Sequence, residues 1–357
     1  MPVSWPPRPA TAPFRHAAVL ALLALAGACS SGSQAAGVRA STTSSESPSS
    51  SSSTEAPTTT TTLPPVYPLT GRPVDNPGIA ARPAVSVKID NIAEARPQAG
   101  IGAADVVYEE FTEGITRFIV VFHSNDADLV GPVRSVRPAD PVITGSLGGV
   151  LGFSGGSPAA VALATASTLT TVTENNQDVM YRRPGRVAPH NLYTSSAGLR
   201  SKAPAGAGPP VPLAGFLRGG EEFGGPGAVP VAGMTIVPAP YVTAGYDWDT
   251  ASSTWLRSTD GRPHLLDPGG RIAPTTVVVQ FTPYLEFAAD SKVQYPDVLG
   301  TGEARVFAAG KMVKGTWSKP NAETPTALAL ADGTPIKLPP GQTWFHLVAP
   351  GSSVTVG

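Results

Sequence analysis

The segment Gly152-Phe153-Ser154-Gly155-Gly156 is where the sequence first offers chemistry, because it fits the pattern G-x-S-x-G. In α/β-hydrolases that pattern holds a nucleophilic serine on a sharp turn between a strand and a helix. His190 lies further along the chain and could act as the general base. The alternating strand and helix units of a hydrolase sheet are missing around this segment, however. Ser154 with His190 is therefore a weak candidate for a catalytic pair.

The same segment is also typical of a structural turn before a helix. Gly155 and Gly156 would form the turn. Ser157 would then cap the helix that Pro158 opens. Amide groups at the N-terminus of a helix bind anions readily, because they lack partners and the helix dipole is positive there. We therefore expect Gly155, Gly156 and Ser157 to contribute to an anion-binding site.

Basic side chains are the expected companions of this turn: Arg134, Arg137, Arg182, Arg183, Arg186 and His190. Guanidinium groups suit carboxylate or phosphate ligands. This group of basic residues stands out in a chain whose net charge is −1. An equally open alternative is that they form structural ion pairs with carboxylates such as Asp90, Glu109, Glu110 or Glu113. The predicted ligand-binding set is Arg134, Arg137, Gly155, Gly156, Ser157, Arg183, His190 and Asn191.

Three carboxylates offer a second kind of chemistry. Two carboxylates on either side of a sugar bond suit a glycosidase. Because Glu109 and Glu110 would point to opposite faces of a strand, only one of them can share a pocket with Asp90. Asp90 with Glu110 is therefore a weak catalytic candidate, and ordinary ion pairing is the more common role of such residues.

Neither metal nor cofactor chemistry is indicated by the remaining residues. His123, His190, His264 and His346 lie far apart in the sequence, with no HExxH pattern. The chain has a single cysteine, Cys29, which excludes a zinc site built from cysteines. We expect no cofactor and no bound metal.

Aromatic residues gather in the C-terminal part, where Tyr246, Trp248, Trp255 and Arg257 would lie near one another in a hairpin. Such a patch could stack against carbohydrate. Tryptophans in short strands are more often part of the core.

The predicted elements that must position these residues belong to the α+β fold class. Residues 84–90 (AVSVKID) alternate as a half-buried strand does, and 106–113 with 117–124 suggest a hairpin whose second strand is central. Asp140-Pro141 and Ser157-Pro158 each predict the start of a short helix. Residues 66–205 are therefore expected to form a mixed α/β domain.

A segment rich in glycine and proline, 206–233, is expected to link that domain to a second one. Beyond it, residues 234–357 contain short β-like runs separated by turns such as Asp260-Gly261 and Asp332-Gly333. This predicts a mostly β domain, a sandwich or a small barrel.

The N-terminal residues predict export and lipid anchoring. Residues 1–28 combine arginines, a short apolar run (17–26) and small residues before Cys29, which is typical of a lipoprotein signal peptide. Cys29 is the expected lipidation site. Residues 29–65 are almost entirely Ser, Thr, Pro, Ala and Gly, and are expected to be a disordered tether. The predicted location is the outer face of the cytoplasmic membrane, in the cell envelope.

Several short motifs together resemble the YerB-like lipoproteins, a family of unknown function with a distinct C-terminal partner domain. In the first half they are 87–91 (VKIDN), 96–100 (RPQAG), 107–110 (VYEE), 114–118 (GITRF), 131–138 (GPVRSVRP), 154–158 (SGGSP) and 190–193 (HNLY). In the second half they are 261–264 (GRPH), 300–302 (GTG) and 315–317 (GTW). The resemblance runs from about residue 67 to 350 and implies a two-domain lipoprotein, but no particular activity.

The leading functional hypothesis is a non-catalytic module that is anchored to the membrane and binds a cell-wall glycan or an anionic polymer. The alternatives are a cell-wall-directed hydrolase and a structural module that docks on a protein partner, whose identity the sequence does not indicate. Export and the balanced charge argue against nucleic acid as a partner.

Overall fold

The computed structural model describes residues 63–239 and 242–357, so the predictions for the signal peptide, Cys29 and nearly all of the tether lie outside the described residues. The first half contains four short helices, α1 (Pro77–Ala81), α2 (Asp140–Thr144), α3 (Pro158–Thr165) and α4 (Ser196–Arg200). Its strands are β1 (Val85–Asp90), β2 (Gln98–Ala99), β3 (Val106–Thr112), β4 (Ile115–Phe122), β5 (Val150–Gly152), β6 (Thr170–Val172), β7 (Tyr181–Arg182) and β8 (Leu192–Tyr193).

The second half is built from strands. They are β9 (Val229–Pro230), β10 (Gly233–Ala239), β11 (Val242–Asp249), β12 (Thr254–Thr259), β13 (Arg262–Pro263), β14 (Leu266–Asp267), β15 (Thr276–Phe281), β16 (Tyr284–Phe287), β17 (Asp290–Pro296), β18 (Gly300–Ala308), β19 (Lys311–Lys319), β20 (Ala327–Ala329), β21 (Thr343–Val348) and β22 (Val354–Val356). The protein is thus mostly β, as predicted for this half.

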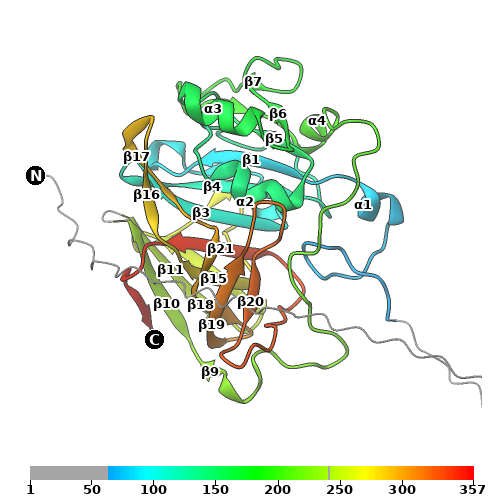
Figure 1. Ribbon diagram of the computed structural model, residues 1–357, viewed down its shortest axis with the longest axis vertical. Coiled ribbons are helices and arrows are strands. Elements are labelled where there is room, and N and C mark those ends of the chain that lie inside the picture. The colour runs from blue at the N-terminus through cyan, green and yellow to red at the C-terminus, as the bar shows by residue number, and fades with distance from the viewer. Residues whose placement is uncertain (1–62, 240–241) are drawn as a thin grey trace, which may run out of the picture. The chain divides into compact units, whose positions relative to one another are not determined.

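One large sheet runs through both halves of the chain (Figure 1). Its strand order is β20-β19-β18-β15-β21-β3-β4-β1-β5-β6, with β9 paired to β19. The two halves meet where β21 pairs in parallel with β3, placing His346 opposite Glu109. All six residues of β21 are buried, so this strand needs a neighbour on both edges and cover on both faces. The described residues accordingly form one compact unit, whereas a sandwich or barrel confined to residues 234–357 had been expected.

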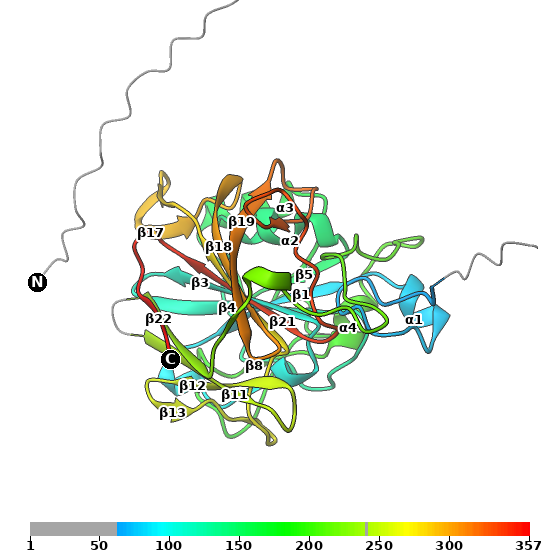
Figure 2. The ribbon, with the colours of Figure 1, turned by 90° about the horizontal axis from the view of Figure 1, so that it is seen from below.

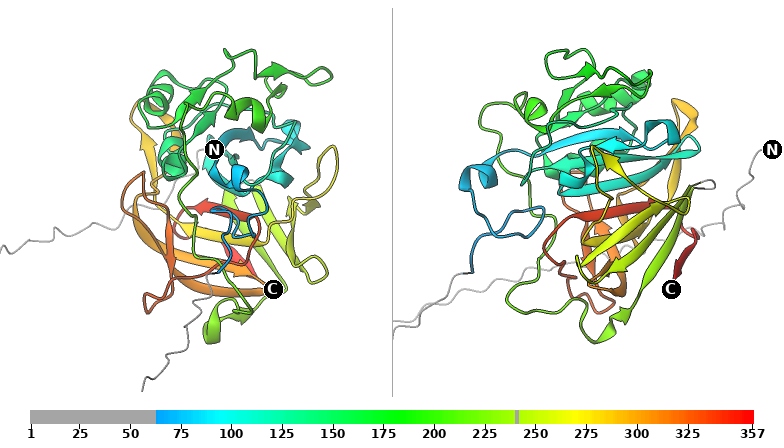
Figure 3. Two further views of the ribbon diagram at one scale, coloured as in Figure 1. Left: turned by 90° about the vertical axis from the view of Figure 1, so that its right-hand side faces the viewer. Right: turned by 180° about the vertical axis from the view of Figure 1, so that it is seen from behind.

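A second sheet of five strands, in the order β13-β12-β11-β10-β22, covers one face of the large sheet. Figure 2 shows it on the side opposite to α2 and α3, and Figure 3 shows the same layers from two other directions. The core between the two sheets includes Trp255, Trp344 and Phe118. On the other face, a second core gathers around Tyr108, Ile119 and Phe345.

The prediction that 84–90 forms a half-buried strand was wrong in one respect. The strand exists as β1, but every residue of it is buried, including Ser86, Lys88 and Asp90. β1 lies inside the sheet between β4 and β5, and both of its faces are covered. Buried charges of this kind need partners, and those partners lead to the site.

Two other local predictions were confirmed. β3 and β4 form the antiparallel hairpin, with β4 between β3 and β1. Ser157 caps α3, since its Oγ accepts a hydrogen bond from the Ala160 amide at 3.3 Å. The helix at Asp140 also forms, although its capping position is Ala139 and Asp140 lies in the first turn.

Candidate functional site

The side chain of Asp90 is the centre of the candidate site. It stands at the end of β1, and no part of it is exposed. Its Oδ2 lies 2.9 Å from Nε of Arg134 and 2.7 Å from Nδ1 of His190. We call these three residues the Asp90 cluster. A buried carboxylate thus holds two groups that are themselves about one-fifth exposed.

Backbone hydrogen bonds fix the segments that carry the cluster. The Asp90 amide donates to the Pro132 carbonyl at 3.0 Å, and the Arg134 amide donates to the Lys88 carbonyl at 2.9 Å. On the other side, the Val133 amide donates to the Leu192 carbonyl at 2.7 Å. Residues 131–134 are therefore held between β1 and β8, which places Arg134 and His190 on the two sides of Asp90.

Arg134 and His190 keep nitrogen atoms that do not contact Asp90. Within the described residues, the two Nη groups of Arg134 and Nε2 of His190 make no hydrogen bond to protein. Because Nδ1 of His190 faces a carboxylate, that nitrogen carries the proton, and Nε2 is an acceptor in the neutral ring and a donor in the cation. The two Nη groups of Arg134 can therefore donate together to one anionic group.

The predicted turn lies beside this cluster. The Ser154 amide donates to the Arg134 carbonyl at 2.9 Å, and the Val136 amide donates to the Gly155 carbonyl at 3.0 Å. Gly155 has a φ of 60°, a left-handed conformation that glycine adopts without strain. The hydroxyl of Ser154 donates to the Val133 carbonyl at 3.3 Å, while His190 bonds to Asp90. Ser154 and His190 are thus neighbours of the same segment but are not hydrogen-bonded to each other.

Arg137 belongs to a different group of charges. It is almost fully buried and forms an ion pair with Glu113, which also pairs with Arg117 at 3.1 Å. Its Nη1 donates to the Val136 carbonyl at 2.9 Å. Burial, together with the nearby charge of Arg137, lowers the pKa of Arg117 to about 10. Arg137 therefore has the structural ion-pair role that the sequence left open, and does not join the Asp90 cluster.

The other predicted ligand-binding residues fasten the hairpin of β7 and β8. Arg183 forms an ion pair with Asp267 of the second half and lies 5.4 Å from the ring centre of Tyr193. Asn191 accepts a hydrogen bond from Nη1 of Arg182 at 2.7 Å and donates to the Arg186 carbonyl at 3.3 Å.

Glu110 is inaccessible. It forms a buried ion pair with Lys88, whose Nζ also lies 2.7 Å from Oδ1 of Asp140. Burial raises the pKa of Glu110 to about 7. Arg117 lies on β4, between β1 and β3, and is paired with Asp90 on one side and with Glu110 on the other. The Cα atoms of Asp90 and Glu110 are therefore two strand spacings, roughly 10 Å, apart. The pairing of Asp90 with Glu110 therefore lacks an open space between two exposed carboxylates.

A second buried network was not predicted. Glu109 accepts from Arg257 on β12 (3.0 and 3.2 Å), from the Trp344 indole (3.1 Å) and from the Thr116 hydroxyl (2.9 Å). Burial alone would raise the pKa of Glu109, but Arg257 and His346 lower it overall. The signal for this network was the presence of Glu109 and Glu110 inside a predicted strand that also contains Val106, Val107 and Phe111.

The aromatic patch expected around that arginine is part of the core. Tyr246 and Trp255 are buried between the two sheets, and Trp248 packs against the same core. The Tyr246 hydroxyl accepts from Nη1 of Arg257 and lies 2.9 Å from Nε2 of His346. Tyr246 and Trp255 therefore have no exposed face to offer to a sugar, and Trp248 is only partly exposed.

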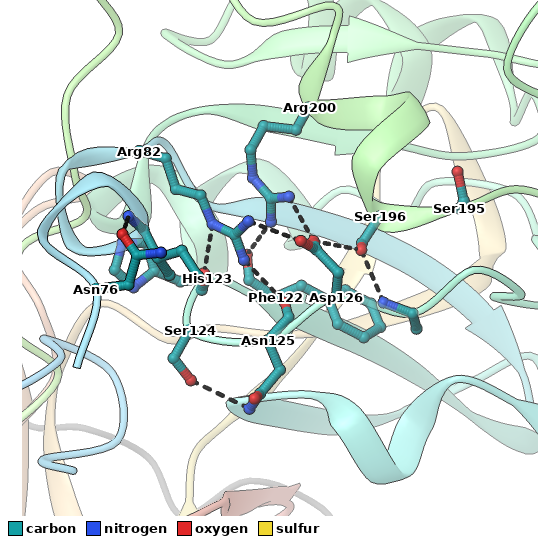
Figure 4. A network of polar contacts seen from close by, with 12 residues as sticks. Asn76, Arg82, Phe122, His123, Ser124, Asn125, Asp126, Ser195, Ser196 and Arg200 are labelled. Carbon is teal, nitrogen blue, oxygen red and sulfur yellow. Dashed lines mark hydrogen bonds and ion pairs between the residues drawn. The ribbon is translucent and has the colours of Figure 1, made fainter. Parts of the chain in front are cut away.

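A third group of charges closes the far end of β4 (Figure 4). Asp126 accepts from Arg82 at 2.7 Å, from Arg200 at 2.5 Å and from the Ser196 hydroxyl at 2.7 Å. Both arginines also donate to backbone carbonyls, including those of His123 and Pro83. Their donors are used within the protein, so this group ties α1 and α4 to the sheet.

The described residues contain no group of three His, Cys, Asp or Glu side chains arranged to hold a metal ion. Over 63–239 and 242–357, no helix has the length and apolar character needed to cross a bilayer.

The fold and the site together define a β-rich protein of two interlocked halves with the Asp90 cluster at the end of β1. Residues 69–207 match the family described as "Protein of unknown function (DUF3048) N-terminal domain", and residues 236–345 match its C-terminal domain. The chain belongs to this family. The boundary between the two matched domains falls in the glycine- and proline-rich segment.

A relative and a solved structure agree with this assignment. The chain is 26% identical over 295 residues to the Bacillus subtilis protein named "Putative lipoprotein YerB", covering 79% of this chain and 85% of that protein. The crystal structure of YerB protein from Bacillus subtilis has the same fold, with a TM-score of 0.70 at 23% identity, over 82% of this chain and all of that one. The family resemblance predicted from the motifs is thereby confirmed, and it supports a lipoprotein whose activity is unknown.

Proposed function

We propose that the protein is a lipid-anchored module of the cell envelope that binds an anionic ligand at the Asp90 cluster. The observation that carries the proposal is the shared carboxylate. Asp90 fixes Nε of Arg134 and Nδ1 of His190 and, among the residues that the structure describes, leaves the other nitrogens of both side chains without a protein partner. The predicted lipidation of Cys29 would hold this module close to envelope polymers.

The geometry suits a phosphate or carboxylate group. Nη1 and Nη2 of an arginine form a planar fork that matches two oxygens of one anion. Since Asp90 contacts Nε of Arg134, it positions the fork without occupying it. Ser157 caps α3 on the adjoining turn, and the N-terminus of a helix favours negative charge.

Binding of inorganic phosphate and of poly(glycerol phosphate) tests the proposal by calorimetry, with the chain from Ser30 onward. Arg134→Gln is expected to weaken binding at least about tenfold, because it removes a charged hydrogen-bond donor. Arg262→Gln is the matched control, since Arg262 is exposed on β13 in the other half. The proposal fails if neither anion binds, or if Arg134→Gln and Arg262→Gln bind alike.

A hydrolase is the second candidate, and one observation favours it. A histidine oriented by a buried carboxylate at 2.7 Å, with its other nitrogen free, is the arrangement of a general base. The Ser154 hydroxyl would have to leave the Val133 carbonyl in order to act as the nucleophile. Hydrolysis of p-nitrophenyl acetate that is lost in both Ser154→Ala and His190→Gln would support this candidate. An unchanged rate in Ser154→Ala would remove it.

A further inference from the structure

A groove of about 440 Å³ lies beside the hairpin of β7 and β8. Such a volume is within the range of about 300–1,000 Å³ that is usual for small-ligand sites. Buried Met180 and Leu192 supply its apolar base. The ring of Tyr181 also lines the groove and is 46% exposed. A large aromatic ring exposed at a groove is available to a ligand rather than to the core.

The other lining residues are polar and chemically mixed: Glu174, Asn175, Gln177 and Arg182. The two amides each offer donors and an acceptor, the carboxylate accepts and the guanidinium donates. Oε2 of Glu174 is shielded from solvent and has no hydrogen-bond partner in the part of the chain that the structure describes. A buried acceptor without a partner is costly, and a hydroxyl or amide of a ligand would satisfy such a carboxylate.

The groove adjoins the Asp90 cluster through two short connections. The Glu174 carboxylate lies against Gly155, where an added Cβ would stand only 3.1 Å from Oε1. Leu192, which lines the groove, accepts a hydrogen bond from the amide next to Arg134. The groove and the Asp90 cluster are therefore neighbours in the fold, close enough to be tested as two parts of one ligand site.

We infer that the groove is a subsite for a sugar ring of an N-acetylated oligosaccharide. The CH face of a sugar stacks on an aromatic ring, and its hydroxyls pair with mixed donors and acceptors. An acetamido group carries one amide donor and one acceptor, which complement the side chains of Asn175 and Gln177. This inference rests on the proposed function only in assigning an acidic group of the same ligand to Arg134.

Titration of the chain from Ser30 onward with chitotetraose tests the inference, because this probe is neutral. Tyr181→Ala is expected to weaken chitotetraose binding about tenfold, and Tyr181→Phe to preserve it, because stacking needs the ring and not the hydroxyl. Val187→Ala is the control, since Val187 is 81% exposed on the loop of the same hairpin and does not line the groove. Chitotetraose that does not bind, or that binds Tyr181→Ala as tightly as the unchanged chain, overturns the inference. An equal loss in Val187→Ala also overturns it.

Phosphate binding separates this inference from the proposed function. Arg134→Gln should weaken phosphate binding and leave the affinity for chitotetraose within about twofold, while Tyr181→Ala should do the reverse. Phosphate binding without chitotetraose binding would refute the sugar subsite alone. Chitotetraose binding that depends on Tyr181, with no phosphate binding, would refute the anionic site and support the subsite.

Discussion

Arg257 and Glu109 form an ion pair that is fully buried between the two halves of the protein. Nη1 of Arg257 lies 3.0 Å from Oε2 of Glu109, and Nη2 lies 3.2 Å from Oε1. The arginine comes from the five-stranded sheet and the carboxylate from β3 of the large sheet. In the part of the chain that the structure describes, no other cation contacts both oxygens of Glu109, so this pair ties the two sheets together.

Arg257→Met is expected to lower the free energy of unfolding by about 3–5 kcal/mol, because it leaves the Glu109 carboxylate buried without its cation. Urea denaturation followed by tryptophan fluorescence measures this change. The double variant Arg257→Met with Glu109→Leu should recover most of the loss, since neither charge then remains. A cost below about 1 kcal/mol for the single change would show that the pair does not hold the sheets together.

His346 should make stability depend on pH. Burial lowers its pKa to about 4, against 6.5 for the free side chain. Below pH 6.5 His346 binds a proton in the unfolded chain but not in the folded protein, so stability is lost as the pH falls towards 4. Each such group contributes about 1.4 kcal/mol per pH unit in this window. His346→Gln should reduce the measured slope by about that amount, and an unchanged slope between pH 4 and 6.5 would contradict the prediction.

Glu110 should act in the opposite direction. Burial raises its pKa to about 7, against 4.5 for the free side chain. The unfolded chain releases this proton from about pH 4.5 upwards while the folded protein keeps it, so stability falls as the pH rises towards 7. Glu110→Gln should therefore make stability rise more steeply with pH between 4.5 and 7. The same urea titrations at several pH values test this, and a less steep rise in the variant would reverse the assigned sign.

β1 shows how far the sequence leads and where it stops. Its alternating residues correctly predict a strand, because the spacing of Val85, Val87 and Ile89 is a local property. The same alternation suggests that Lys88 and Asp90 face water, which is wrong. The partner of Asp90 in the cluster, His190, is 100 residues away along the chain, and a local pattern carries no information about a partner so distant.

Only part of the candidate site was predicted, because local patterns do not show which distant residues meet. Arg134, His190 and the turn at Gly155 were predicted together from their residue types, and the structure places them around residues 131–134. Arg137 has the same side chain three residues further on, yet it pairs with Glu113. Which arginine meets which carboxylate depends on the order of strands in the sheet. Here the order is β3-β4-β1, and no periodicity of the sequence reveals it.

Cys29 provides the last prediction, which concerns where this module works. The sequence predicts that Cys29 is lipidated and becomes the first residue of the exported protein, and two acyl chains hold a protein on a bilayer far longer than one. Cys29→Ser should move the protein from the membrane fraction to the soluble fraction, with its urea denaturation unchanged.

Ser30→Ala is the matched control and should stay with the membrane. Mass spectrometry of the N-terminal peptide would detect the added acyl mass in the control and not in Cys29→Ser. Retention of Cys29→Ser in the membrane fraction after a carbonate wash would mean that another feature provides the anchor, and the Asp90 cluster would then need a different explanation for its access to envelope polymers.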